Sequence, residues 1–155
     1  MTITLFKPKL EDLWFRKALL ADERTMSYNR TWGGTIDFPE ENWKSWYGFW
    51  VSNPEDRRYY RYVKDENGNF IGEIAYHFDP DLGGNIANVI IHSEYRSKGY
   101  GSLALDMLCK EAKDHGIDVL YDDIAKDNPA IKLFLGHGFE EVGRTDGKII
   151  LRKKL

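Results

Sequence analysis

The chain has 155 residues, 42% of them hydrophobic, which is enough for one domain with a buried core. The net charge of −3, with acids and bases interspersed, gives no broad basic surface and argues against nucleic-acid binding. No apolar run is long enough to span a membrane and no signal-peptide pattern occurs, so we expect a soluble cytoplasmic protein. The single cysteine, Cys109, excludes an internal disulfide and a structural zinc cluster, and no metal site is expected.

The first third of the chain predicts a strand and two helices. Residues 2–8 alternate like a strand, and Pro8 precedes a helix. The apolar face of that helix is predicted to consist of Leu10, Leu13, Trp14, Ala18 and Ala21. A turn-rich aromatic loop follows, and Asp37 and Glu40 then have the spacing of a capping box. The second helix is predicted from the spacing of Trp43, Trp46, Tyr47 and Trp50.

The rest of the chain alternates between β-rich and helical patterns. Strands are predicted at 58–65, 70–78, 85–91, 118–124, 139–144 and 148–154, and helices at 102–115 and 128–137. The order is β-α-α-β-β-β-α-β-α-β-β. It indicates an α/β (α+β) fold, with a mixed central sheet flanked by helices, in one domain over residues 1–155.

A basic, glycine-punctuated loop joins the strand ending at Ile91 to the helix near Gly101. Gly99 and Gly101 allow backbone N–H groups to turn toward one point, and the helix start adds unpaired donors and a positive dipole end. Arg96 and Lys98 supply cations, Arg96 with the fork suited to a phosphate. The loop therefore predicts a phosphate or pyrophosphate site, although an ordinary solvated turn has the same residues.

A dinucleotide-binding fold is one alternative for this loop. The sequence "GYGSLA" fits Gly-x-Gly-x-x-Ala, and Asp122 and Asp123 follow about 20 residues later, at the end of the next strand. In that fingerprint the glycines directly follow the strand, whereas here "HSEYRSK" intervenes. Too little chain remains beyond Asp123 for the rest of a doubly wound parallel sheet.

Two motifs together resemble the GNAT family of N-acetyltransferases. Its acetyl-CoA signature, Gln/Arg-x-x-Gly-x-Gly/Ala between a strand and a helix, is similar to "RSKGYG" at 96–101. A second family motif, an Asn, a small residue, an aromatic residue and then Gly-Phe, is similar to "DNPAIKLFLGHGFEEVGR" at 127–144. The resemblance is clearest from Phe70 to Arg144.

The resemblance implies acetyl-CoA as cosubstrate and assigns positions to it. The pantetheine arm would pair with one strand backbone, and the pyrophosphate would lie on the amides of the glycine loop. The cofactor positions implied are Val89, Ile90, Ile91, Arg96, Ser97, Lys98, Gly99, Tyr100, Gly101, Ser102, Asn128 and Phe134. Two departures stand out: Phe134 replaces the tyrosine that protonates the leaving thiolate in many members, and the motif Asn position falls between Asp127 and Asn128.

Acetyl transfer to an amine needs a base, since deprotonating an amine of pKa near 10 at neutral pH costs roughly 4 kcal/mol. Asp122 matches the strand position at which some family members carry an acid, and Glu73 is an acid in an otherwise apolar strand. Asp122 and Asp123 should point to opposite sheet faces. The loop residues Tyr28, Asn29 and Trp32 are candidates for the acceptor wall, and Tyr28 could also supply a proton to the thiolate.

We therefore expect transfer of acetyl from acetyl-CoA to the primary amine of a small molecule, through a tetrahedral intermediate. We expect neither a nucleic-acid nor a membrane partner, and a monomer or homodimer. One alternative is acetylation of a protein or peptide. The other is a non-catalytic acyl-CoA-binding sensor, which the phenylalanine at position 134 suggests.

Overall fold

The computed structural model describes residues 1–52 and 58–155, and at positions 30–32 only the backbone. The strands are β1 Thr4–Phe6, β2 Tyr59–Lys64, β3 Phe70–Asp79, β4 Gly84–Ile91, β5 Val119–Ala125, β6 Glu140–Thr145 and β7 Lys148–Lys154. The α-helices are α1 Leu13–Ala21, α2 Trp43–Tyr47, α3 Tyr100–Asp114 and α4 Ala130–Gly136. The tighter or wider helical turns are η1 Leu10–Asp12, η2 Thr25–Trp32, η3 Glu40–Asn42, η4 Gly48–Ser52 and η5 Ser93–Tyr95.

All seven strands form one sheet, in the order β1-β2-β3-β4-β5-β7-β6. Each neighbouring pair is antiparallel except β4 and β5, which are parallel. The predicted mixed sheet flanked by helices is confirmed. A dinucleotide fold needs a mostly parallel sheet, so this topology argues against that alternative.

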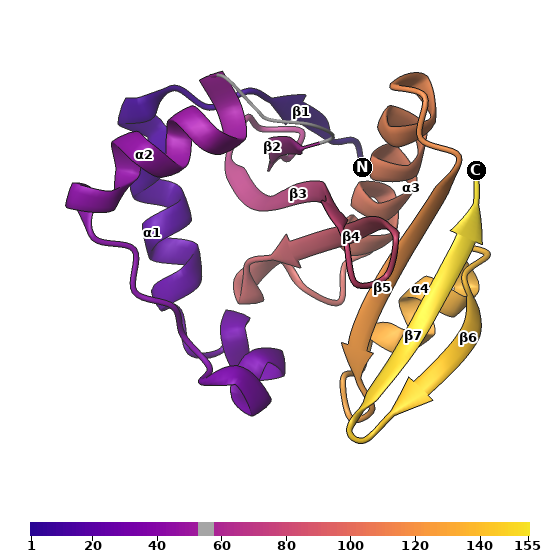
Figure 1. The fold of residues 1–155 in the computed structure, drawn as a ribbon. Helices are drawn as coiled ribbons and strands as arrows, with labels where there is room; N and C mark the ends of the chain where they lie inside the picture. The colour runs from indigo at the N-terminus through magenta and orange to yellow at the C-terminus, as the bar shows by residue number, and fades with distance from the viewer. Residues whose placement is uncertain (53–57) are drawn as a thin grey trace.

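The sheet separates two layers of helices (Figure 1). On the α1 and α2 side, Leu13 and Leu19 of α1 are buried with Tyr62 of β2 and Ala75 of β3, and the aromatic residues of α2 are partly buried against them. The opposite face carries α3 and α4 over a larger core that includes Leu105 and Leu120. Both layers cover one sheet, so residues of either layer can reach the central strands.

Two predictions about the N-terminal helices are wrong in detail. In α1 the buried apolar residues are Leu13, Phe15, Leu19 and Leu20, whereas Leu10 is 40% and Trp14 54% exposed. The separate turn η1 precedes the helix and shifts its register, and Arg16 takes a place on the covered face.

The predicted second helix is divided into η3, α2 and one turn of π-helix, η4. The capping box from Asp37 does not form, because Pro39 occupies the N-cap position and no side chain caps the turn. The aromatic residues nevertheless lie on one face, as their spacing predicts, since the Trp46 and Trp50 rings stack with centroids 6.2 Å apart.

Candidate active site

Strands β4 and β5 separate soon after they begin. Their register consists of Asn85 opposite Leu120 and Ile86 opposite Tyr121, and from there the two strands diverge (Figure 1). Gly84 allows this close start, since a Cβ there would lie 2.4 Å from the Tyr121 ring. Beyond the divergence each strand pairs on its other side only, β4 with β3 and β5 with β7.

The divergence leaves backbone groups of β4 without a neighbouring strand on one side. Val89, Ile90 and Ile91, the strand positions assigned to the cofactor, all lie in this stretch. Ile90 and Ile91 are buried and Val89 packs on the larger core, so their side chains belong to the interior. An extended ligand with amide groups can pair with such an edge as a further strand does.

The turn that leads into α3 has the geometry of an anion site. Ser97 and Gly99 have positive φ angles of 62° and 97°, and no side chain caps the helix that begins at Tyr100. Successive N–H groups in such a turn, together with the first N–H groups of a helix, point at one place and favour negative charge. We refer to residues 97–102 as the phosphate turn, after the ligand predicted for it; Ser97, Lys98 and Gly99 are exposed and Gly101 is partly exposed.

Arg96 does not aim its guanidinium at this turn. Its Nε donates to Ile91 O at 3.0 Å, its Nη1 donates to Arg24 O at 3.1 Å, and its Nη2 donates to Thr25 O. The predicted fork-to-phosphate contact is thus replaced by three bonds to backbone carbonyls. The side chain joins the end of β4 to the segment before η2.

Ser102 and Tyr100, in the first turn of α3, make contacts away from the phosphate turn. Ser102 Oγ lies 2.6 Å from His137 Nε2, and His137 Nδ1 lies 2.6 Å from Asp106 Oδ1. Tyr100 is buried and its hydroxyl donates to Glu66 in the β2–β3 turn at 2.7 Å. These bonds fix the start of α3 against α4 and the β2–β3 turn.

Asp122 is the first residue of β5 past its last pair with β4. Burial of its carboxyl group raises its pKa well above the ordinary value, which a hydrogen bond from the Asp123 backbone only partly offsets. Asp122 pairs with Leu151 and Asp123 with Ile150, so the two side chains leave opposite faces as predicted. Asp123 Oδ2 is 3.3 Å from Lys148 Nζ, so the two neighbouring carboxylates have different surroundings.

Both carboxylate oxygens of Glu73 are hydrogen-bonded to other side chains. Both of its carboxylate oxygens accept from Arg16 Nη1, at 2.9 and 2.7 Å, and Oε2 also accepts from the Tyr60 hydroxyl. Its side chain is only 2% exposed. Of the two carboxylates predicted as bases, the geometry therefore favours Asp122.

The turn η2 brings an aromatic residue toward both carboxylates. Tyr28 is partly buried against the α1 and α2 core, and burial raises its pKa to about 12, with Glu73 and Asp122 adding to the rise. Asn29 Nδ2 donates to Gly34 O at 2.8 Å and so closes its own loop. The side chain of Trp32, the third predicted wall residue, lies outside the described part of the chain.

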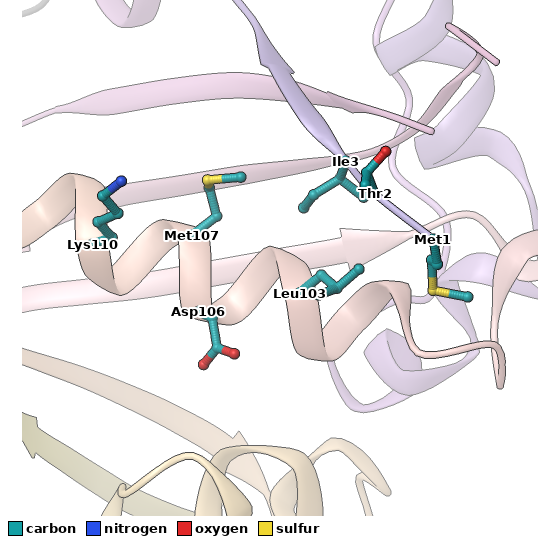
Figure 2. Close-up of a pocket in the computed structure, with 7 residues that line it drawn as sticks. All are labelled: Met1, Thr2, Ile3, Leu103, Asp106, Met107 and Lys110. Atoms are coloured by element: carbon teal, nitrogen blue, oxygen red, sulfur yellow. The ribbon is translucent and has the colours of Figure 1, made fainter. Parts of the chain in front are cut away.

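Two hollows lie outside this centre. One, of about 360 Å³, is formed by the N-terminal residues Met1–Ile3 and by Leu103, Asp106, Met107 and Lys110 of α3 (Figure 2). The other, of about 410 Å³, lies among aromatic side chains of α2 and η4, such as Trp46 and Phe49. Neither contains a residue predicted for the site.

Comparison with known proteins agrees with this geometry. The model of the acetyltransferase (GNAT) family matches residues 18–139. The chain belongs to the GNAT family. No curated protein sequence matched.

Solved GNAT structures match the whole chain. A structure assigned provisionally as a phosphinothricin N-acetyltransferase is 26% identical, with 99% of each chain covered and a TM-score of 0.73. A ribosomal-protein-alanine N-acetyltransferase from Brucella melitensis is 22% identical, with 100% of each chain covered and a TM-score of 0.75. Spermidine N-acetyltransferase from Vibrio cholerae, solved with CoA and spermine, is 20% identical over 97% of this chain and 92% of that chain, with a TM-score of 0.78.

Acetyl-CoA is the cosubstrate of GNAT acetyltransferases, and this chain has the features that it requires. The open edge of β4 fits the amide-containing pantetheine arm, and the uncapped turn at 97–102 fits the pyrophosphate. Over the residues described, no helix is long and apolar enough to cross a membrane. In the same residues, no group of three or more His, Cys, Asp or Glu side chains could hold a metal ion.

The second GNAT motif contributes to the fold more than to an open site. Phe134 is 4% exposed and packs against Phe139, with ring centroids 4.9 Å apart. Asn128 Oδ1 accepts from the Ala130 backbone at 2.8 Å and so supports the start of α4, while Asp127 is exposed. The structure thus gives Asn128, not Asp127, a contact at this position.

Several residues near the GNAT site were missed by sequence reasoning. Arg16, Asp22 and Thr25 lie in or after α1, where no motif marks them, and each has a hydrogen-bond partner more than 50 residues away. His137 lies at the C-terminal end of α4, and its ring contacts Ser102 and Asp106, which no sequence motif indicates. The predicted apolar face of the first helix left Arg16 on the exposed side, so the sequence pattern gave no signal for its burial.

Proposed function

We propose that the protein transfers the acetyl group of acetyl-CoA to the primary amine of a small molecule. One observation carries the proposal: Asp122, with a raised pKa, begins the stretch of β5 that no longer pairs with β4, beside the open edge of β4. A base of raised pKa is better matched to an amine than an ordinary aspartate is. Family membership supports the acyl donor.

In the proposed reaction Asp122 takes a proton from the amine, directly or through a water molecule. The nitrogen then attacks the thioester carbonyl, the C–N bond forms, and the nitrogen releases its second proton to water. A backbone amide near Ile91 stabilises the tetrahedral oxyanion. The C–S bond breaks as the intermediate collapses, and the thiolate of CoA takes a proton.

Tyr28 is the proposed source of that last proton. Phe134 has no proton to give, and its ring is part of the core. Tyr28 lies within electrostatic range of Asp122 and Glu73, and its phenol stays protonated because burial raises its pKa to about 12. Since CoA thiolate is a stable leaving group, water could supply the same proton more slowly.

The class of acceptor follows less directly from the site. Similar proteins are named for phosphinothricin, spermidine and ribosomal-protein alanine, so both small amines and a peptide N-terminus are reasonable trial acceptors. We favour a small molecule. The family resemblance supports this choice, and the exposed acids Asp81 and Asp127 could attract a cationic amine. A cytoplasmic monomer or homodimer remains our expectation for the working enzyme.

The test has two steps. Thermal unfolding is measured first with acetyl-CoA, CoA and NADH, because a ligand at 100 times its Kd adds about 2.7 kcal/mol of stability. Stabilisation by both CoA species but not by NADH supports the donor site. Thiol release is then measured with spermidine, phosphinothricin, amino-acid derivatives and a peptide with N-terminal alanine. If CoA binds but no amine raises thiol release above the hydrolysis background, the result would instead favour the non-catalytic sensor.

A further inference from the structure

Two segments about 70 residues apart in the chain are joined by a network of hydrogen bonds. Thr25 Oγ1 accepts from Ser93 N at 2.9 Å and donates to Asp22 Oδ2. Asp22 Oδ2 also accepts from Thr25 N and from Ser93 Oγ, both at 2.9 Å. Thr25 is 0% exposed, so its hydroxyl is shielded from competing water.

Arg96 adds a second connection beside the first. Its guanidinium donates to Ile91 O on one side and to the carbonyls of Arg24 and Thr25 on the other. Bonds from a charged donor are among the stronger hydrogen bonds of a protein. The end of β4 and the start of η2 are therefore held together by two sets of contacts that share Thr25.

Each joined segment leads directly into one half of the active site. Ser97, the first residue of the phosphate turn, follows Arg96. Tyr28, in the proposed acceptor wall, lies one turn after Thr25 in η2. A change in the order of the phosphate turn can therefore reach the acceptor wall through Arg96 and Thr25.

We propose that Asp22, Thr25, Ser93 and Arg96 are positioning residues that couple the acyl-donor site to the acceptor wall. Binding of phosphate groups fixes the positive φ angles of Ser97 and Gly99 and with them the backbone of Arg96. Because the donor has then already restricted η2, acceptor binding loses less conformational freedom. The acceptor therefore binds more tightly after the donor than before it. The coupling expected is a factor of about 5 to 150 in acceptor affinity. This inference rests on the proposed function.

The experiment follows backbone hydrogen exchange in the full chain with and without saturating CoA, because this readout needs no known acceptor. In the wild type, CoA should slow exchange both in residues 97–103 and in residues 25–29. Thr25→Val is nearly isosteric but removes the hydroxyl bonds to Ser93 N and Asp22 Oδ2, while the backbone bond from Thr25 N to Asp22 remains. It should keep its CoA affinity within about threefold and its protection at 97–103, and lose most of the protection at 25–29.

Two further variants keep the test decisive if Thr25→Val folds poorly. Ser93→Ala removes only the bond to Asp22, and it should reduce the protection at 25–29 in the same direction. Ser27→Ala is the matched control: its hydroxyl donates to Arg24 O within the same loop at 3.0 Å, without reaching β4. It should behave as the wild type does.

Arg96→Lys separates the positioning role from a phosphate contact. If Arg96 is a positioning residue, Arg96→Lys should change the CoA affinity little, and CoA should no longer slow hydrogen exchange at residues 25–29. A rise of tenfold or more in the Kd for CoA would make it a phosphate ligand and overturn its assignment here. CoA binding to the wild type without protection at 25–29 overturns the inference alone, whereas absence of CoA binding overturns the proposed function as well.

Discussion

Arg16 and Glu73 form a buried ion pair between α1 and β3, with Arg16 Nη1 2.7 Å from one carboxylate oxygen and 2.9 Å from the other. The guanidinium also lies 4.4 Å from the centre of the Trp46 ring. Burial by itself would lower the pKa of Arg16, but Glu73 and Tyr60 more than offset that effect and the pKa is raised. The guanidinium therefore stays charged, and its bonds to Glu73 hold α1 on the sheet.

Breaking this pair should destabilise the protein strongly. Glu73→Gln leaves the guanidinium buried without an opposite charge, at a cost of about 3 kcal/mol or more. For a chain of this length the melting temperature should fall by roughly 6 to 12 °C, as measured by calorimetry.

The matched variant removes both charges at once. Arg16→Met retains an apolar side chain beneath the Trp46 and Phe38 rings, and in combination with Glu73→Gln it leaves no unpaired charge. The double variant should lose less stability than the sum of the two single variants. Losses that add within about 0.5 kcal/mol would show that the two residues are not coupled.

The origin of this pair shows which features a sequence can predict. Alternating and helical patterns are local, and they predicted the strands, α3 and the glycine-containing turn before α3. Glu73 was noticed as an acid in an apolar strand, but its partner is 57 residues earlier, and no local pattern links the two. Arg96 illustrates the same limit: its loop position favours a phosphate, and only the folded chain brings the carbonyls of Arg24 and Thr25 to it.

Asp122→Asn should lower turnover with little effect on cofactor binding. The amide cannot accept the proton of the amine, and general-base catalysis typically contributes a factor of 10² to 10⁴. The rate of thiol release should fall in that range, while the Kd for CoA measured by calorimetry stays within about threefold. Asp123→Asn makes the same change on the opposite face of the strand and should retain activity. Equal losses in both variants would count against Asp122 as the base.

Asp122 should also make stability depend on pH. Because burial raises its pKa in the folded state, the folded protein keeps a proton that the unfolded chain has lost above about pH 4. Its contribution to stability is present below that pH and is lost as the pH rises through the folded-state pKa. Over the same interval the base becomes ionised, so kcat/KM should rise. The difference in melting temperature between wild type and Asp122→Asn should therefore shift in favour of the variant as the pH increases.

Tyr28→Phe tests the proposed proton donor. Removing the hydroxyl should lower kcat by roughly 10² or more if the phenol protonates the thiolate, because general-acid catalysis has that magnitude. With a pKa of about 12 the phenol remains protonated through the accessible range, so the wild-type rate should show no fall up to about pH 10. An unchanged kcat in the variant would assign the proton to water.

The glycines of the phosphate turn should respond differently to substitution, although both lie in the same motif. Gly99 has a φ angle of 97°, where an alanine is strained by about 1 to 2 kcal/mol, so Gly99→Ala should distort the turn and weaken CoA binding by tenfold or more. Gly101 lies within α3 with an ordinary φ angle, and an added Cβ would meet Leu133 Cδ2 at 3.5 Å, a normal contact. Gly101→Ala should therefore fold normally and bind CoA within about threefold of the wild type. Calorimetric titration of both variants measures the contrast. If Gly99→Ala bound CoA as well as Gly101→Ala does, the left-handed geometry at Gly99 would not be what presents the backbone amides to the pyrophosphate.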